Sequence, residues 1–271
     1  MSELFHKIFK SYLFSHIHLA ISGGVFCWFL TDLMGSPGLT PLFFGGMVFV
    51  FYNLCAFLGI RGKENHEMNE NQLWTARNMT ELVIAMFFCS FFIVWLFPSY
   101  LNLFLYPLPL YILAGLYLLP NSYLRRNVYL KPSIISLIWV LLPILLIAQK
   151  IPEGNRIALF FLFSAILFLF VFNLSIVYDA KDVDHMDENS MYKNLGVQKI
   201  GMLVLFNTAL IILLLLTIPE RFTLALIPFF LFHGVVLYIS RNIKNALWHL
   251  LVIDGFLGLL GLYYFIIQYS I

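Results

Sequence analysis

Nine long apolar stretches, each bounded by charged residues, Pro or Gly, dominate this sequence of 271 residues. A helix needs about 20 apolar residues to cross the ~30 Å hydrocarbon core of a membrane. Backbone polar groups must be paired inside that core, and stretches of this length exceed a barrel strand, so they are expected to be α-helices. The sequence therefore predicts an all-α membrane protein, a nine-transmembrane-helix bundle, with helices at 12–34, 39–60, 80–98, 102–119, 133–150, 157–178, 200–218, 222–240 and 247–268.

The composition supports this class. Hydrophobic residues make up 61% of the chain and charged residues 11%, which excludes a soluble domain with a solvated surface. Nine crossings with short connections use almost the whole chain, so residues 1–271 are expected to form a single transmembrane domain. The net charge of +2 gives no reason to expect nucleic-acid binding.

The Lys and Arg residues are divided unequally between the two ends of the predicted helices. If the N-terminus is cytoplasmic, only Lys150, Arg156 and Arg221 of the 16 Lys and Arg residues fall on the opposite side. Positive charge is concentrated on the cytoplasmic side of membrane proteins. We therefore expect a cytoplasmic N-terminus and a multi-pass protein of the cell inner membrane, with its charged loops facing the cytoplasm.

Acidic residues are concentrated in the connection after the predicted helix 157–178. If that helix continues for one turn, Asp179 and Asp182 lie on the same face, spaced to hold one hard cation through oxygen ligands. Mg²⁺ held in this way usually bridges to phosphate oxygens, which suits a diphosphate substrate. The alternative is a solvated acidic loop. Asp187 is a further candidate metal ligand, and Lys181 a candidate for binding the substrate.

A second acidic group follows the predicted helix 39–60. Glu64, Glu67 and Glu70 are spaced i, i+3, i+6, which on a helix makes one acidic stripe. Glu64 and Glu67 are therefore candidate metal ligands. The charged face of a short interfacial helix is the alternative.

Basic residues lie in the connection between predicted helices 102–119 and 133–150. Guanidinium groups such as those of Arg125 and Arg126 match phosphate oxygens bidentately, and Lys131 follows them. These three residues are candidates for holding a diphosphate from the side opposite a metal ion. The alternative is the ordinary positive charge of a cytoplasmic loop.

Three ionisable residues fall inside the predicted spans, where burial of charge is expensive and marks candidate functional positions. Asp32 is expected to reach the membrane interface and His233 to hydrogen-bond a backbone carbonyl, which leaves Asp254 as the strongest candidate. Aromatic residues make up 18% of the chain. Their faces can line a cavity for an isoprenoid chain and stabilise a carbocation, although most are expected to face lipid.

Together these features resemble the UbiA superfamily of intramembrane prenyltransferases, over nearly the whole chain. The family's second acidic motif runs approximately D-x-x-D-x-x-x-D and is followed by a segment that ends in L-G. Asp179 and Asp182 match its first two acids, whereas Met186 stands in the third place, one residue before Asp187. The tail matches Leu195-Gly196-Val197, and Tyr123-Leu124-Arg125-Arg126 resembles the family's phosphate-contacting basic pair.

The first family motif departs from the expected pattern. The family has an Asn followed by acids four and eight residues later; Asn53 fits the start, but Phe57 and Arg61 stand in the acidic places. An Arg repels Mg²⁺. Either Glu64, Glu67 and Glu70 supply ligands from a shifted position, or the first metal site is lost. The pattern is similar to a diverged, Bacteroidetes-like branch of the superfamily.

The resemblance implies a Mg²⁺-dependent transferase that moves an isoprenyl group from an isoprenyl diphosphate to a lipophilic acceptor within the membrane. In that interpretation Asp179 and Asp182 are catalytic metal ligands, and the substrate is bound by Asn53, Arg125, Arg126, Lys131 and Lys181. Two alternatives stay open: an intramembrane terpene cyclase with the same fold, and a non-catalytic relative that binds an isoprenoid lipid.

Overall fold

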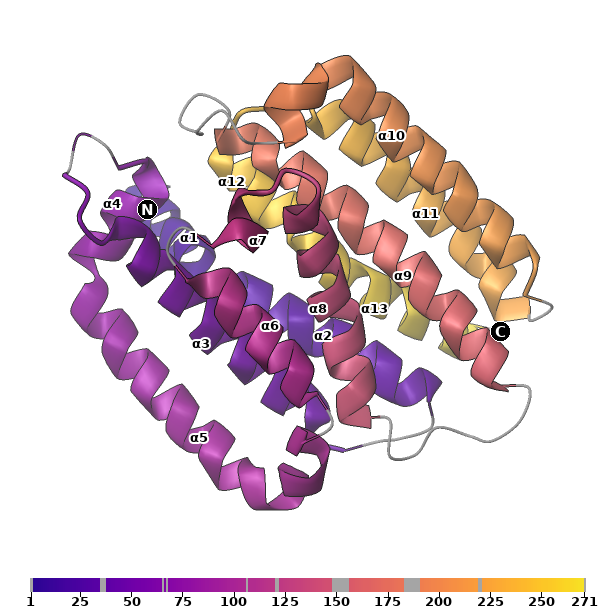
Figure 1. Cartoon of the computed structure of the whole chain (residues 1–271), viewed down its shortest axis with the longest axis horizontal. Coiled ribbons are helices and arrows are strands. Elements are labelled where there is room, and N and C mark those ends of the chain that lie inside the picture. The colour runs from indigo at the N-terminus through magenta and orange to yellow at the C-terminus, as the bar shows by residue number, and fades with distance from the viewer. Residues whose placement is uncertain are drawn as a thin grey trace.

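The computed structural model describes residues 2–34, 38–64, 66, 68–105, 107–119, 122–147, 156–182, 191–218 and 221–270. All regular secondary structure in these ranges is helical (Figure 1). The α-helices are α1 Ser2–Phe14, α2 Ile17–Leu33, α3 Thr40–Ile60, α4 Glu70–Arg77, α5 Met79–Leu105, α6 Leu108–Leu118, α7 Tyr123–Arg126, α8 Leu130–Ile147, α9 Arg156–Tyr178, α10 Met191–Leu216, α11 Arg221–Ser240, α12 Ala246–Trp248 and α13 Gly255–Ser270. A 3₁₀-helix η3, Asp179–Asp182, follows α9, and a π-helix η4, His249–Ile253, joins α12 to α13.

The length and apolar character of the helices make this an all-α, multi-pass membrane protein, as predicted. Within the described ranges, seven helical segments are long and apolar enough to cross a membrane, and α1 with α2 adds an eighth if that bent pair is one span. Each of the nine predicted stretches contains a helix. The fourth differs most, because α5 continues through Pro98 to Leu105 and leaves α6 with 11 residues.

The helices run side by side, and the charged connections gather at one end of the bundle. In Figure 1 the N-terminus, α4, α7 and α12 lie at the upper left, and the C-terminus lies at the opposite end. The connections that follow α3, α6 and α9 all leave from the first end. The described residues of the two acidic groups and of the basic group therefore belong to the same end of the molecule.

Helix α2 packs against α3 and α13 at positions where the neighbouring helix carries glycine. A Cβ atom on Gly45 of α3 would lie 2.9 Å from the carbonyl oxygen of Ala20, and one on Gly261 of α13 would lie 2.7 Å from that of Val25. Small residues let helix backbones approach closely inside membranes, where packing rather than water drives association. These contacts make α2, α3 and α13 a tightly joined group.

The first predicted helix, 12–34, is interrupted. Helices α1 and α2 are bent by 55° relative to each other, and His16 at the break has a φ of 60°, a conformation uncommon for a residue with a side chain. Asn53 of α3 supports the break: its Nδ2 donates hydrogen bonds of 2.9 Å to the carbonyls of Ser15 and Phe49. Neither Pro nor Gly stands at this break, so it could not be predicted from the local sequence.

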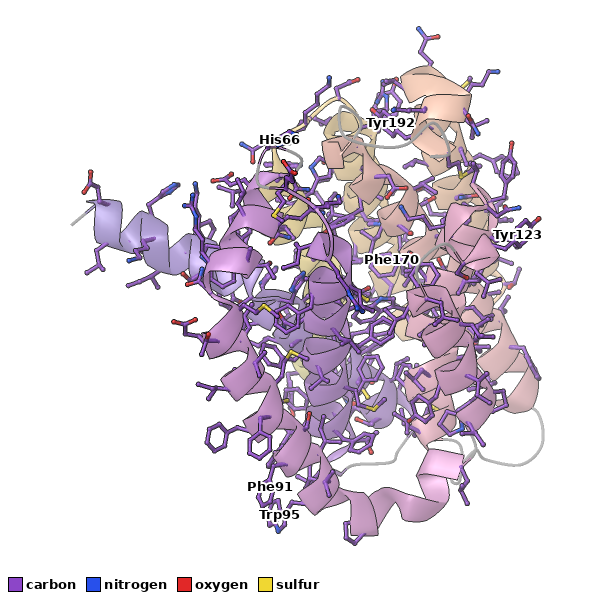
Figure 2. The ribbon with its side chains drawn as sticks, turned by 60° about the vertical axis from the view of Figure 1, so that its left-hand side comes forward. His66, Phe91, Trp95, Tyr123, Phe170 and Tyr192 are labelled. Atoms are coloured by element: carbon purple, nitrogen blue, oxygen red, sulfur yellow. The ribbon has the colours of Figure 1, made fainter. Side chains whose placement is uncertain are left out.

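An aromatic cluster at the contact of α9, α11 and α13 encloses a histidine. His233 is fully buried, and its ring centroid lies 4.6 Å from that of Phe170 and 5.0 Å from that of Phe256. Figure 2 shows Phe170 inside the bundle, whereas Phe91 and Trp95 of α5 point away from it. Neither ring nitrogen of His233 has a hydrogen-bond partner in the described part of the chain. The expected bond to a backbone carbonyl is therefore wrong.

Replacing His233 with leucine is expected to stabilise the protein by about 1 kcal/mol, because an unpaired buried polar group costs roughly 1–3 kcal/mol and leucine has none. The measurement is the unfolding transition of both proteins in mixed detergent micelles. Asn207→Leu is the contrasting variant and should destabilise, since Asn207 Nδ2 donates a 2.8 Å bond to Asn173 Oδ1. A loss of stability in His233→Leu equal to that of Asn207→Leu would show that the imidazole has a stabilising role.

Candidate functional site

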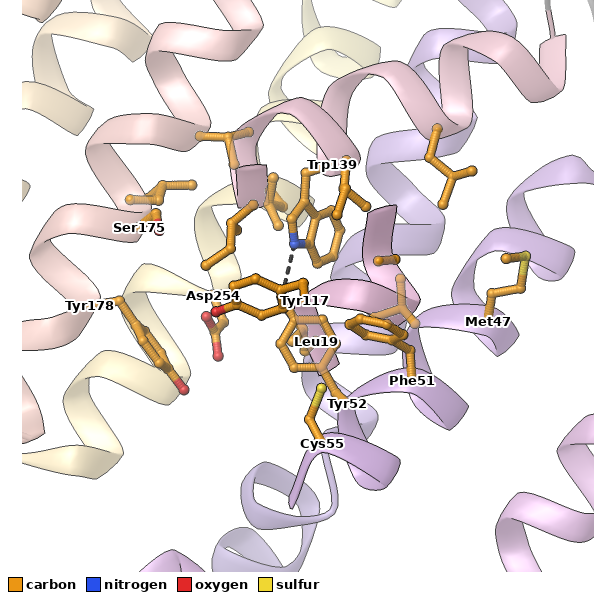
Figure 3. A pocket seen from close by; sticks show the side chains of 18 of the residues that line it. Leu19, Met47, Phe51, Tyr52, Cys55, Tyr117, Trp139, Ser175, Tyr178 and Asp254 are labelled. Carbon is orange, nitrogen blue, oxygen red and sulfur yellow. Dashed lines mark hydrogen bonds between the residues drawn. The ribbon is translucent and has the colours of Figure 1, made fainter. Parts of the chain in front are cut away.

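A cavity of about 300 Å³ lies between α2, α3, α6, α8, α9 and α13 (Figure 3). Each helix contributes one face. On α3 the lining residues are spaced i, i+3, i+4, i+7, i+8 and i+11, the repeat of a single helical stripe; they are Phe44, Met47, Val48, Phe51, Tyr52 and Cys55. The lining is mostly apolar, and it includes the aromatic side chains of Tyr111, Tyr117, Trp139 and Tyr178.

Charged groups come to the cavity from three separate helices. Lys131 stands in the first turn of α8, Asp179 is the first residue of η3 at the end of α9, and Asp254 lies between η4 and α13. Among the described lining residues these three are the charged ones, two carboxylates and one ammonium group. The cavity is therefore amphipathic, with a largely apolar body and a small charged region.

Lys131 and Asp179 bind each other. The distance from Lys131 Nζ to Asp179 Oδ1 is 2.6 Å, and the two side chains are 24% and 10% exposed. Both charges are largely shielded from solvent, which strengthens their attraction but adds a desolvation cost. From the sequence, Lys131 was predicted to bind phosphate and Asp179 to bind a metal ion, whereas in the structure the two side chains bind each other at the cavity.

The ion pair predicts non-additive effects of mutation. Lys131→Met or Asp179→Asn alone is expected to cost about 1–2 kcal/mol of stability, less than for a fully buried pair because solvent reaches both groups. The double variant should lose less than the sum of the two, since it leaves no unpaired charge. Unfolding curves of the wild type and the three variants measure this coupling. Additive losses would mean that the two charges do not support each other.

The remaining residues of the second acidic motif and of the basic group are described in part. The turn predicted beyond Tyr178 is present as η3, and because a 3₁₀-helix has three residues per turn, positions 179 and 182 stand one above the other along it. Lys181 also belongs to η3, and Arg125 and Arg126 belong to α7. The structure describes the backbone of Asp182, Lys181, Arg125 and Arg126. Asp187 lies outside the described residues.

The candidates from the first motif lie elsewhere. Asn53 is fully buried and holds the α1–α2 break, while its neighbour Tyr52 lines the cavity and accepts a 2.9 Å hydrogen bond from Trp139 Nε1 (Figure 3). Glu64 has a side chain that is 79% exposed and pairs with His66 at 3.4 Å. Glu67 lies outside the described residues.

The acidic stripe predicted for this loop is wrong, because no single helix carries it. Asn69 caps α4 by accepting a bond from the Gln72 amide, while the Gln72 side chain accepts one from the Asn69 amide, so the helix begins at Glu70. Glu64 precedes that start. Glu70 forms an ion pair with Lys10 of α1.

Carboxylate oxygens, the donor type that Mg²⁺ prefers, are present at the cavity. In the described ranges no three His, Cys, Asp or Glu side chains come together as a possible metal site. Two carboxylates, those of Asp179 and Asp254, nevertheless line the cavity. Mg²⁺ is commonly held by one or two carboxylates, with substrate phosphates and water completing its shell.

Sequence reasoning singled out Asp254, Asp179 and Lys131 but missed the aromatic residues around them. Tyr52, Tyr117 and Trp139 belong to helices that are apolar on all sides, so no polar face indicated which side lines a cavity. The spacing of Phe44, Val48, Phe51 and Cys55 is helical, as is that of many other apolar residues in α3. Only the packing of the helices selects this stripe.

Comparison with known proteins finds no match: no family model, no curated protein and no solved structure resembles this chain at a significant level. The function must therefore be argued from the cavity and its charged residues.

Proposed function

We propose that the protein is an intramembrane prenyltransferase of the UbiA type, which binds an isoprenyl diphosphate in the cavity and transfers the isoprenyl group to a lipophilic acceptor. The observation that carries this proposal is the amphipathic cavity: an aromatic, apolar body next to the Lys131–Asp179 pair. An isoprenyl diphosphate has the same division between a long apolar chain and a charged head.

The charged region suits the leaving group. When the bond between the allylic carbon and the diphosphate oxygen breaks, the electron pair leaves with the diphosphate, whose charge increases. The Lys131 ammonium group can stabilise that charge through hydrogen bonds, and Arg125 and Arg126 are proposed to assist from α7. A bound Mg²⁺ would supply further electrostatic stabilisation through its contacts with phosphate oxygens. Asp179 and Asp182 are proposed as its ligands.

The aromatic body suits the isoprenyl chain and its cation. The faces of Tyr52, Tyr117 and Trp139 lie in the cavity wall, and aromatic faces attract positive charge. The apolar lining excludes water, which would otherwise capture the allylic cation before the acceptor does. A terpene cyclase would use the same groups.

The nine-helix UbiA arrangement is part of the proposal. It counts α2, the second helix of the bent pair, as the first span and α6 as a short fourth span, which adds two to the seven long apolar segments. In this proposal the protein lies in the cell inner membrane with its N-terminus in the cytoplasm. The charged end of the bundle then faces the cytoplasm. The diphosphate head of the substrate would then enter the cavity from the cytoplasmic side.

The proposal is tested by binding of a non-hydrolysable geranylgeranyl diphosphate analogue to the purified protein, with and without Mg²⁺. Binding should require the metal and weaken at least about 10-fold in Asp182→Asn, the usual loss when metal coordination is disturbed. Asp32→Asn removes the same charge from α2, where Tyr264 donates a 3.1 Å bond to Asp32, and should bind normally. Glu64→Gln tests the shifted-ligand hypothesis, which predicts a loss like that of Asp182→Asn.

A non-catalytic isoprenoid-binding protein is the second candidate, and one observation favours it. Asp179, the first acid of the motif, already has its carboxylate held by Lys131. If the ion pair persists with ligand bound, this carboxylate has less charge to offer a metal. Metal-independent binding of the analogue, equal in wild type and Asp182→Asn, would support this candidate and rule out the transferase.

A further inference from the structure

A second carboxylate, distinct from the Lys131–Asp179 pair, lines the cavity immediately before α13. Asp254 follows the π-helix η4, and its backbone amide donates to the His249 carbonyl at 3.2 Å, five residues earlier. π-helical turns are rare in proteins, but those that occur are often found at functional sites. The extra residue in such a turn changes which side chains face inward. Both Ile253 and Asp254 line the cavity, and Leu257 lines it one turn later.

Aromatic rings surround this carboxylate. Figure 3 shows the side chains of Asp254 and Tyr117 pointing toward each other, with Tyr178 on the other side of Asp254. Tyr52 lines the same cavity as Asp254 and Tyr117. A carboxylate in such surroundings is costly for a membrane protein and indicates a functional position.

The charges of the cavity favour a positive ligand. Among the described lining residues two carboxylates, Asp179 and Asp254, stand against one ammonium group, Lys131, so the formal charge of the lining is −1. The aromatic faces add to the attraction, since their quadrupoles present negative charge to the cavity. An apolar wall strengthens both effects because it lowers the local dielectric constant.

We propose that Asp254 and the aromatic rings beside it form a binding site for a lipophilic cation. In the proposed transferase, on which this second role rests, the cation is the allylic carbon chain from which the diphosphate has departed. Lys131 and Asp179 then serve the leaving group, and Asp254 serves the positive charge that remains. The site itself does not require the reaction: it should bind any isoprenoid chain that carries a positive charge at its end.

The experiment compares farnesylamine, which is protonated at neutral pH, with uncharged farnesol. Both are added to the protein in nanodiscs of zwitterionic lipid, with empty nanodiscs as the blank for partitioning. The wild type should bind the amine at least 10-fold more tightly than the alcohol. Asp254→Asn should lose this preference, whereas Asp254→Glu, which keeps the charge, and Asp32→Asn, which removes a carboxylate elsewhere, should retain it.

The outcomes separate this inference from the proposed function. No preference in the wild type, or a preference that survives in a folded Asp254→Asn, overturns the cation site. If Asp254→Asn does not fold, the wild-type preference and its retention in Asp254→Glu still decide the question. Binding of the geranylgeranyl diphosphate analogue with Mg²⁺ reports separately on the proposed function. If the wild type does not bind the analogue but still prefers farnesylamine, the cation site is supported and the proposed transferase is not.

Helix α1 carries a second, independent inference. Leu4, Phe5 and Ile8 are 64%, 72% and 59% exposed, and at 100° per residue they lie within about 100° of one another around the helix, with Lys7 about 160° from Phe5. Figure 2 shows α1, the indigo helix, extending away from the bundle. Because α1 and α2 form a bent apolar pair, we infer that α1 lies along the membrane surface, with its apolar side in lipid and Lys7 toward anionic headgroups.

Spin labels test this placement in nanodiscs. A label on Phe5→Cys should be relaxed by oxygen dissolved in lipid, and one on Lys7→Cys by an aqueous nickel complex. The unsubstituted protein, with native Cys27, Cys55 and Cys89, is the blank. Lipid exposure at both positions would place α1 across the membrane, and water exposure or protection at both would indicate a free helix or a protein partner; each result overturns the surface placement.

Discussion

Trp139→Ala is expected to destabilise the protein by about 3 kcal/mol or more, the usual cost of removing a large buried aromatic side chain. Trp139 is 6% exposed, and its ring centroid lies 5.7 Å from that of Phe44 in an edge-to-face contact. Its outer ring atoms also cover Gly23 of α2, where a Cβ would lie 3.1 Å away. Because no smaller side chain fills this space, the cavity should enlarge, and the unfolding transition should shift to milder conditions.

Trp95→Ala is the matched control. Trp95 is 67% exposed on the outer side of α5, where lipid surrounds it, so its removal leaves no internal space. Its unfolding transition should stay close to that of the wild type. Equal losses in the two variants would mean that Trp139 is not a structural part of the cavity wall.

Gly261→Val is expected to lower stability by at least about 2 kcal/mol, because overpacking forces the neighbouring backbone to move. The first atom of any side chain here would lie 2.7 Å from the Val25 carbonyl oxygen and 2.9 Å from its Cγ1, closer than real contacts allow. Helices α2 and α13 would have to separate. The loss is measured by unfolding in mixed micelles and by the yield of folded protein.

Gly115→Ala provides the comparison. Gly115 lies within α6, and a Cβ there meets no atom within 4 Å. Alanine favours helix over glycine by up to about 1 kcal/mol, so this variant should be as stable as the wild type or slightly more so. If Gly261→Val were as stable as Gly115→Ala, α2 and α13 would not be in backbone contact.

The sequence was sufficient for the class of the protein and for the end at which its charges gather. Spans of about 20 apolar residues have one physical solution in lipid, so the helices predicted at 39–60 and 222–240 lie within one residue of α3 and α11. Alternating direction then puts the connections after α3, α6 and α9 at one end. Asp254 could also be singled out from sequence, because a charge inside an apolar stretch is conspicuous.

The local sequence could not show how the first and fourth predicted helices differ from the helices in the structure. The break at Ser15 and His16 depends on hydrogen bonds from Asn53, which is 37 residues away from His16 in the sequence. Pro98 appeared to end a helix, yet α5 continues past it. Proline removes only one backbone hydrogen bond, and a neighbouring helix can compensate inside a membrane.

The candidate site was only partly predictable for the same reason. A charged residue in sequence has a type but no partner, so Lys131 and Asp179 were assigned to different ligands although they bind each other. The aromatic wall had no signal, since every side of α3, α8 and α9 is apolar. Contacts among distant helices decide which of those sides encloses a cavity.

The brevity of α6 has a consequence for how the protein responds to its membrane. Its 11 residues span roughly 16 Å, about half of the hydrocarbon thickness, yet Tyr111, Ala114 and Tyr117 of this helix form part of the cavity wall. Lipid chains or a locally thinned bilayer must cover the rest of that depth, and such hydrophobic mismatch carries a cost that grows with thickness. Ligand affinity should therefore depend on acyl-chain length, with the bilayer acting as a structural component of the cavity.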